Sequence, residues 1–123
     1  MKDLPADAVR WKFEIEADGK HIGWISSYTD LGYIDNEEGI RAIGLDIPCV
    51  EDRNKGYGAV AFRMFLDYLR EHGERSFFTQ TWSGNLPMVR LAEKLRFREI
   101  VRIKDLREVR GRKYDALTFR LDL

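Results

Sequence analysis

The sequence has few of the residues and runs that would place it in several large classes of protein. Its single cysteine, Cys49, excludes an intrachain disulfide framework and fits a reducing compartment. None of its apolar runs approaches the ~20 residues that cross a bilayer, and the charged start, Met1 to Arg10, lacks the apolar stretch of a signal peptide. We therefore expect a cytoplasmic protein that has no membrane partner.

Charge of one sign is also missing. The chain has 21 Lys and Arg against 21 Asp and Glu, so it lacks the basic excess of a protein that binds nucleic-acid phosphates. Its two histidines, His21 and His72, are far apart and have no neighbours at metal-ligand spacing. We expect neither nucleic acid nor metal. A length of 123 residues predicts a single domain, 1–123, with one core.

The first half of the chain alternates in the manner of strands. Val9–Ala17 places apolar and charged residues on opposite faces, and Asp18-Gly19 predicts a hairpin into a second strand, His21–Tyr28. A third strand is predicted over Ile40–Ile47, where Pro48 ends it because proline donates no ladder hydrogen bond.

The second half alternates between helices and strands. A helix is predicted from Gly56 to the C′ glycine Gly73, with Val60, Met64 and Phe65 on its apolar face. The rest of the chain predicts a strand, an Asn-capped helix and two strands joined by a loop: Ser76–Trp82, Asn85–Leu95, Arg98–Ile103, Tyr114–Leu121, with the loop at Val109–Lys113. The order β-β-β-α-β-α-β-β predicts an α/β fold, in which the fourth strand runs parallel to the third.

A glycine-rich basic segment, Arg53-Asn54-Lys55-Gly56-Tyr57-Gly58, precedes the long helix. Its glycines allow close backbone approach, and the helix N-terminus adds unpaired N–H donors and partial positive charge. This combination is suited to pyrophosphate; the alternative is a glycine-rich helix start with solvated charges. The dinucleotide pattern Gly56-x-Gly58-x-x-Ala61 is disfavoured, because eight residues separate the glycines from the preceding strand.

A second candidate is Asn85, which follows the predicted fourth strand. Two parallel strands that splay apart leave backbone N–H and C=O groups unpaired, and an amide side chain can bind an extended ligand in that gap. The alternative is that Asn85 only caps the second helix.

The two motifs together, Arg-x-x-Gly-x-Gly before one helix and Asn85 before another that ends in Lys94-Leu95-Arg96-Phe97, resemble the Gcn5-related N-acetyltransferase (GNAT) superfamily, in particular its ribosomal-protein-acetyltransferase-like branch. The resemblance implies a mixed central sheet that is splayed between two parallel strands, with acetyl-CoA as co-substrate. It assigns the pyrophosphate to the backbone of Arg53, Asn54, Lys55, Gly56, Tyr57, Gly58 and Ala59. The pantetheine arm would pair near Ile47 and Cys49 and contact Asn85, and Lys94 would reach the phosphate or adenine end.

The chain also departs from that family. It lacks the usual N-terminal strand and helix pair ahead of the first hairpin. Ala92 stands where many members have the tyrosine that protonates the leaving thiolate, and Gln80 where some have a glutamate base. The remaining candidates for an acid or a base are Tyr57, Glu51 and Asp46. Arg96 replaces a glycine, which would strain the backbone if its φ is positive.

The resemblance implies acetyl transfer by direct attack of a primary amine on acetyl-CoA in a ternary complex. The acceptor would be a protein N-terminus, a polyamine or an aminoglycoside-like small molecule, and a homodimer is possible. The alternative is a catalytically weak or inactive module that binds CoA or a partner, as Ala92 and the missing N-terminal elements suggest.

Overall fold

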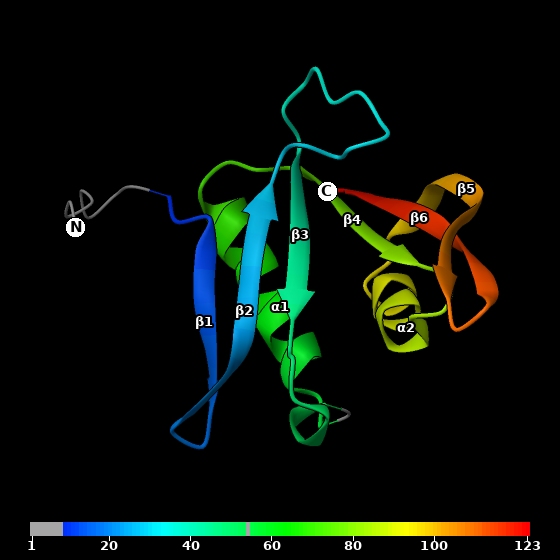
Figure 1. The fold of residues 1–123 in the computed structure, drawn as a ribbon. Helices are drawn as coiled ribbons and strands as arrows, with labels where there is room; N and C mark the ends of the chain where they lie inside the picture. The colour runs from blue at the N-terminus through cyan, green and yellow to red at the C-terminus, as the bar shows by residue number, and fades with distance from the viewer. Residues whose placement is uncertain (1–8, 54) are drawn as a thin grey trace. The chain divides into compact units, whose positions relative to one another are not determined.

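Six strands form one mixed sheet in the order β1-β2-β3-β4-β6-β5. The computed structural model describes residues 9–53 and 55–123, and Figure 1 shows its elements in chain order. They are β1 (Lys12–Ala17), β2 (Lys20–Tyr28), β3 (Arg41–Asp46), the 3-10 turn η1 (Val50–Asp52), α1 (Tyr57–Glu71), β4 (Ser76–Trp82), α2 (Leu86–Lys94), β5 (Arg98–Val109) and β6 (Arg112–Asp122). The predicted α/β class and element order are confirmed.

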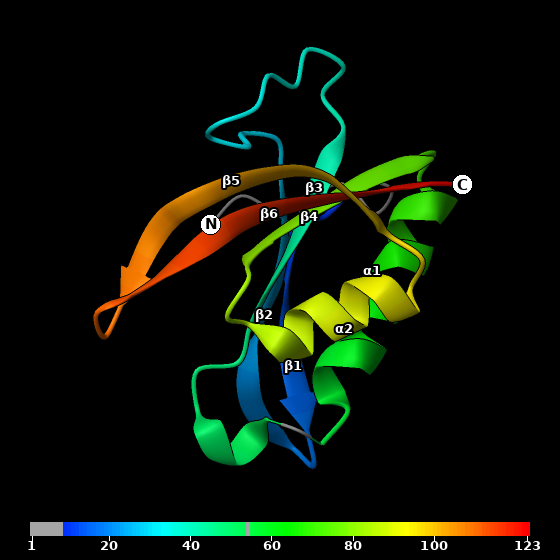
Figure 2. The same cartoon turned by 90° about the vertical axis from the view of Figure 1, so that its right-hand side faces the viewer.

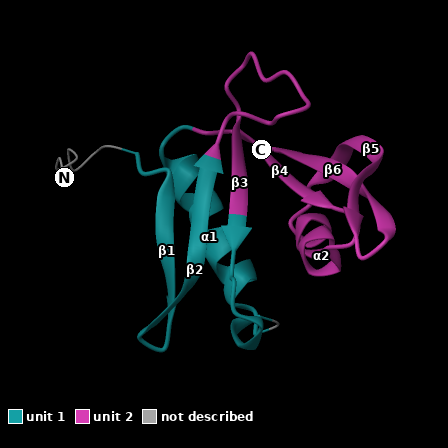
Figure 3. Cartoon of the chain, in the orientation of Figure 1, with its two compact units in different colours: residues 1–27, 45–73 teal, residues 28–44, 74–123 magenta. Residues whose placement is uncertain are grey.

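The chain divides into two compact units (Figure 3). The first unit comprises residues 1–27 and 45–73, and the second unit comprises residues 28–44 and 74–123. Among the helices of the described residues, none is long and apolar enough to cross a membrane. The same described residues contain no cluster of three or more His, Cys, Asp or Glu that would hold a metal ion.

The first unit packs the β1–β2 hairpin against α1. Phe13 of β1 lies opposite Ile25 of β2, and its ring meets Phe65 and Tyr68 of α1 edge-on, with centroid distances of 5.7 and 5.1 Å. At Gly23 the backbone of β2 lies so close to the end of β3 that an added Cβ would stand 2.0 Å from the carbonyl oxygen of Asp46. The packing of β2 against the end of β3 therefore requires glycine at position 23.

The predicted apolar face of α1 is wrong at two positions. Val60 and Met64 are 58% and 66% exposed, whereas Phe62 and Leu66 are buried together with Phe65 and Leu69. α1 has more apolar residues than fit on its buried face, and the periodicity alone does not identify which of them are exposed. Two apolar side chains therefore remain at the surface of the first unit.

The second unit holds the parallel pairing that the sequence predicts. β3 and β4 pair at Arg41 with Phe77 and at Ala42 with Phe78. One buried cluster of this unit is Leu31, Ile40, Ala42 and Phe78, against which Tyr28 and Ile34 pack. Figure 2 shows β5 and β6 as one long curved hairpin of this unit.

The last hairpin differs from its prediction. The sequence predicts a loop over residues 109–113, but β5 extends to Val109 and β6 begins at Arg112. The turn is only Arg110-Gly111, with φ values of 51° and 78°, which is typical of a tight type I′ hairpin. Arg112 and Lys113 lie in the exposed start of β6, where no apolar alternation marks a strand.

Arg96 has a φ of 68°, so the strain expected from the missing C′ glycine is present. We predict that Arg96→Gly raises the free energy of unfolding by about 1 kcal/mol relative to Arg96→Ala, because both remove the side chain but only glycine adopts this conformation freely. Urea denaturation of the two variants measures the difference. Equal stability would show that the positive φ is not strained.

Candidate functional site

The segment between β3 and α1 is held by the side chain of Arg53. Its Nε donates to the carbonyl oxygen of Ile47 at 2.8 Å, and its Nη2 donates to that of Pro48 at 3.0 Å. The N–H of Asp52 donates to the carbonyl of Cys49 within the η1 turn. The sequence predicted Arg53 as part of a pyrophosphate site; in the structure its guanidinium fixes the path of the chain that leaves β3.

The N-terminus of α1 is open to an anion. Its N-cap, Gly56, has a φ of 82°, and no side chain caps the helix. The first intrahelical bond runs from Val60 N to Gly56 O, so the N–H groups of Tyr57, Gly58 and Ala59 have no intrahelical acceptor. Unpaired donors at the positive end of a helix dipole form an anion site.

Gly58 also brings α1 close to the end of β3. A Cβ at this position would lie 2.8 Å from Cδ2 of Leu45 and 3.6 Å from Cδ1 of Ile47. The second glycine of the motif thus serves the packing of helix on strand.

The charges around this segment are of both signs. Lys55 and Arg53 are exposed. Asp52 is 7% exposed, its Oδ1 lies 3.7 Å from Nζ of Lys20, and its Oδ2 has no hydrogen-bond partner in the described residues. The sequence missed Asp52, because nothing in the polar run from Val50 to Lys55 marks one carboxylate as buried.

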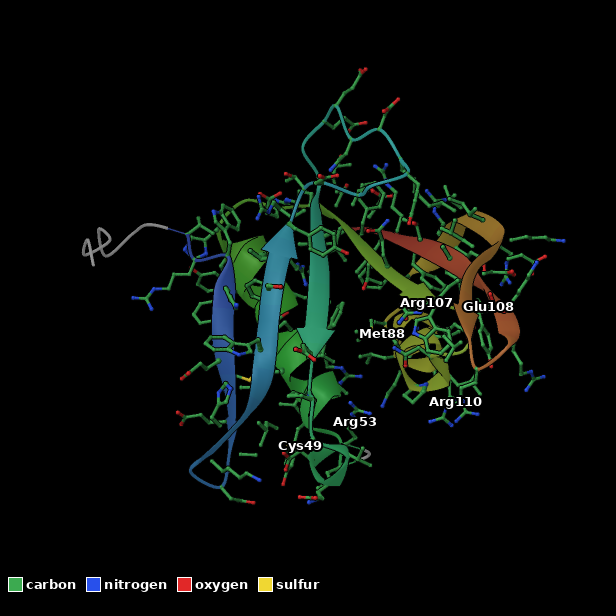
Figure 4. The ribbon with its side chains drawn as sticks, viewed as in Figure 1. Cys49, Arg53, Met88, Arg107, Glu108 and Arg110 are labelled. Atoms are coloured by element: carbon green, nitrogen blue, oxygen red, sulfur yellow. The ribbon has the colours of Figure 1, made fainter. Side chains whose placement is uncertain are left out.

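The remaining candidates of the first unit lie on or near the same segment. Cys49 is exposed just beyond β3, and Figure 4 shows it close along the chain to Arg53. Asp46 and Glu51 are exposed. The hydroxyl of Tyr57 lies 3.5 Å from Oδ2 of Asp18 in the β1–β2 turn. Asn54, which the resemblance assigns to the pyrophosphate, lies outside the described residues.

In the second unit, Asn85 caps α2 as its alternative interpretation predicted. Its Oδ1 accepts from Met88 N at 3.4 Å, and Asn85 N donates to Trp82 O at 2.9 Å. The preceding turn is tied to β6 by a reciprocal pair, because Ser83 N donates to Asp115 O and Asp115 N donates to Ser83 Oγ. The cap uses the amide oxygen of Asn85, which leaves its amide nitrogen for another partner.

Two further positions on α2 differ in their exposure to solvent. Ala92 is completely buried, so a phenol at this position would displace the core. Lys94 is exposed in the last turn of the helix, where it is accessible to a ligand.

The backbone ladder between β3 and β4 changes character after two residue pairs. The second pair is Ala42 with Phe78, and the next carbonyl, of Ile43, accepts from the hydroxyl of Thr79 at 2.9 Å. Thr79 is 1% exposed. A side chain thus takes over from the backbone inside the second unit.

Both the oxygen and the nitrogen of the Gln80 side-chain amide are hydrogen-bonded. Its Oε1 accepts from the hydroxyl of Tyr28 at 3.2 Å, and its Nε2 donates to Leu31 O at 3.0 Å and to Thr118 Oγ1 at 3.1 Å. Burial raises the pKa of Tyr28, which keeps its hydroxyl a donor. An amide in this network has no basic lone pair to offer, so position 80 supplies structure and no general base.

A hollow of about 470 Å³ lies in the second unit beside Gln80. The guanidinium of Arg107 stands 4.9 Å from the ring of Trp82, and Tyr114 meets the same ring edge-on at 4.8 Å. Figure 4 labels Arg107 on β5. The hollow is lined by Tyr33, Gln80, Thr81, Trp82, Leu106, Arg107 and Ala116.

Asp115 holds the irregular part of β5 near this hollow. Its Oδ2 accepts from Arg102 Nη1 at 2.6 Å, and its Oδ1 accepts from the N–H of Asp105 at 3.1 Å, where φ is 55°. The Arg102 hydrogen bond, followed by that from Asp105, lowers the pKa of the Asp115 carboxyl. The contacts of Asp115 therefore fix the backbone of β5 at Asp105.

Neither a protein-family model nor a curated protein matches the sequence. Solved structures do match: ribosomal-protein-alanine N-acetyltransferase from Brucella melitensis at TM-score 0.75 and 18% identity, yncA from Salmonella typhimurium, solved with its cofactor acetyl-CoA, at 0.72 and 21%, and an N-acetyltransferase from Staphylococcus aureus Mu50 at 0.77 and 14%.

These structures are longer than the chain. The matches cover 91%, 88% and 90% of this chain but 68%, 61% and 66% of the three structures, respectively. At such low identities the likeness establishes the fold, which is that of N-acetyltransferases with a six-stranded mixed sheet and two helices.

We predict a pH-dependent effect of Asp115→Asn. Because the folded-state pKa of Asp115 is lowered, its stabilisation is present above the ordinary aspartate pKa and is lost as the pH falls through the folded-state value. Urea denaturation should show the variant less stable at pH 7, with the difference shrinking as the pH falls below the ordinary aspartate pKa of about 3.9. Asp67→Asn, at an exposed site on α1, is the control. A difference that is constant down to pH 3 would contradict the role of the charge.

Proposed function

We propose that the protein is an N-acetyltransferase that transfers the acetyl group of acetyl-CoA to a primary amine. The observation that carries the proposal is the open N-terminus of α1, which follows a segment fixed by Arg53 in a fold of this class. Among the matching structures, that of yncA was solved with acetyl-CoA as its cofactor, and the anion site described above fits a pyrophosphate.

The donor contacts follow from the residues of the first unit. The N–H groups of Tyr57, Gly58 and Ala59 would bind the pyrophosphate, and the exposed ammonium of Lys55 would add charge to that contact. Just beyond β3, the N–H groups of Ile47 and Cys49 would donate to the pantetheine carbonyls, because their own carbonyls already accept from Arg53 and Asp52. The roles of Asn85 and Lys94, which lie in the second unit, rest on the family resemblance.

The reaction is a direct transfer. The neutral amine attacks the thioester carbonyl, the C–N bond forms, the C–S bond breaks, and CoA leaves as a thiolate. The attacking nitrogen becomes cationic as its bond forms and loses one proton to water or to the leaving thiolate, which gives the amide. Backbone N–H groups near Cys49 would hold the oxyanion. A thiol has a pKa near ~8.5, so its thiolate leaves without the phenol that Ala92 has replaced, and a missing general acid costs about 10²–10⁴ in rate.

The hollow beside Gln80 is the proposed acceptor site. Arg107 gives it positive character, which disfavours polycationic acceptors such as polyamines and aminoglycosides. An amine that also has a carboxylate or a peptide group fits better, so a protein N-terminus leads the three acceptor classes. A homodimer is also proposed and is argued below from β1. We also propose that the protein belongs to the ribosomal-protein-acetyltransferase-like branch and that it is cytoplasmic.

The second candidate is a module that binds CoA without transferring its acetyl group. The bound amide of Gln80 and the buried Ala92 favour it, because neither position supplies an acid or a base. An assay with an amine panel separates the two, since binding of acetyl-CoA with no acetylated product would leave only this module.

Lys55→Glu tests the donor site. We expect acetyl-CoA and CoA at 100 times the dissociation constant to stabilise the protein by about 2.7 kcal/mol, which is a thermal shift of several degrees, and NAD to give none. The shift should disappear in Lys55→Glu, because the variant places a carboxylate at the pyrophosphate. Lys113→Glu, on exposed β6, is the matched control. No shift in the parent protein would overturn the proposal.

Arg53→Lys tests whether the guanidinium acts by its geometry. Lysine keeps the charge, but one ammonium cannot reproduce the fork that holds two carbonyl oxygens. We expect acetyl-CoA binding by calorimetry to weaken roughly tenfold, whereas Arg63→Lys on the exposed side of α1 leaves it unchanged. Unchanged affinity in Arg53→Lys would show that only the charge matters.

A further inference from the structure

β1 is the first strand of the sheet, and its outer edge has no strand beside it in the described residues. Ser27 N donates to Trp11 O, and Phe13 and Ile15 lie opposite Ile25 and Gly23 of β2. Alternate residues of a strand direct their backbone groups to opposite edges, so Lys12 and Glu14 present theirs outward. Such an edge is a template for a further strand.

The side chains along this edge are charged in a self-complementary order. Arg10 and Lys12 are followed by Glu14 and Glu16, all exposed. An antiparallel copy related by a two-fold axis at Phe13 would place Lys12 opposite Glu14, and Arg10 opposite Glu16, in both directions. An axis at Lys12 or Glu14 would place that residue against itself. An axis at Trp11 or Ile15 would pair the two basic or the two acidic residues.

The backbone is compatible with this register. With the axis at Phe13, the pairs that exchange hydrogen bonds are Lys12 with Glu14 of the copy and the reverse. These are the residues whose N–H and C=O groups point outward. Every axis through a residue of β1 pairs outward-facing residues with one another, so the backbone permits this arrangement and the side-chain charges select it.

An apolar groove of about 490 Å³ lies between β1 and α1 on the other face of this strand. Phe13, Ile15, Val60 and Met64 help to line it, and Val60 and Met64 are 58% and 66% exposed. A two-fold axis perpendicular to the sheet keeps both copies of α1 on the same face. Pairing through β1 would thus bring a second set of apolar side chains to an exposed apolar surface, which favours association.

We propose that the protein forms a two-fold symmetric homodimer in which the β1 strands pair antiparallel about Phe13, so that the sheets of the two copies are joined edge to edge. The two copies present the same surface to one another, as a closed dimer requires. The proposal is independent of the acetyltransferase function.

A charge exchange in the full chain tests the arrangement. Sedimentation velocity over a range of concentrations should show a dimer for the parent protein. Glu14→Lys and Lys12→Glu should each weaken it at least tenfold, because each places like charges opposite one another twice per dimer. The double variant Lys12→Glu with Glu14→Lys restores opposite charges and should restore the dimer. Lys104→Glu, exposed on β5, is the control.

Three outcomes would overturn the proposal. The first is a parent protein that stays monomeric at about 100 μM. The second is a dimer whose dissociation constant is unchanged by Glu14→Lys. The third is a double variant that dimerises as weakly as the two single variants. Hydrogen exchange in the monomeric single variants identifies the occupant. Loss of protection at Lys12 and Glu14 supports pairing with a copy, whereas retained protection shows that another segment of the same chain covers the edge.

Discussion

The conformation of the first unit at its candidate site depends on one guanidinium that holds two carbonyl oxygens. Arg53 binds the carbonyls of Ile47 and Pro48, so the chain leaving β3 turns back at a fixed point before α1 begins. With those carbonyls taken up, the groups that the segment offers to a ligand are chiefly N–H donors. Gly56 continues this effect by starting the helix without a side-chain cap. One cation of the protein thereby removes competing acceptors, which leaves a surface suited to an anion.

Much of the fold could be predicted because its signals are local. β4 was predicted with the bounds that the structure has, Ser76–Trp82, since its aromatic and β-branched run is bounded by turn residues. The caps Gly73 and Asn85 were predicted because few residue types suit a positive φ or an N-cap. The exposed hairpin at residues 109–113 was missed, since its pairing is stabilised between strands and leaves no apolar period in the sequence.

The candidate site could be predicted only as far as residue types allow. The sequence located the segment from Arg53 to Gly58 but not the direction in which Arg53 points, because a bond from a side chain to a backbone carbonyl leaves no motif. The burial of Asp52 and the hydroxyl of Thr79 on Ile43 were likewise invisible. Each depends on a contact between segments that are distant in the sequence or on a turn that no pattern specifies. Local chemistry was therefore predictable, and orientation was not.

The hydrogen bonds that fix Gln80 have a consequence for which amines can react. An amide bound at both its oxygen and its nitrogen accepts no proton from an ammonium group, so an amine in the proposed acceptor site beside it would have to arrive already neutral. At pH 7.5 an α-amino group, with a pKa near 7.8, is roughly one third neutral, while a lysine ε-amino group, with a pKa near 10.4, is neutral in only about one molecule in a thousand. Without any contact that distinguishes the two, protonation alone would favour chain termini over lysine side chains by more than about two orders of magnitude. This selectivity would decrease at higher pH, because the neutral fraction of lysine side chains would rise while that of the chain terminus approaches its limit.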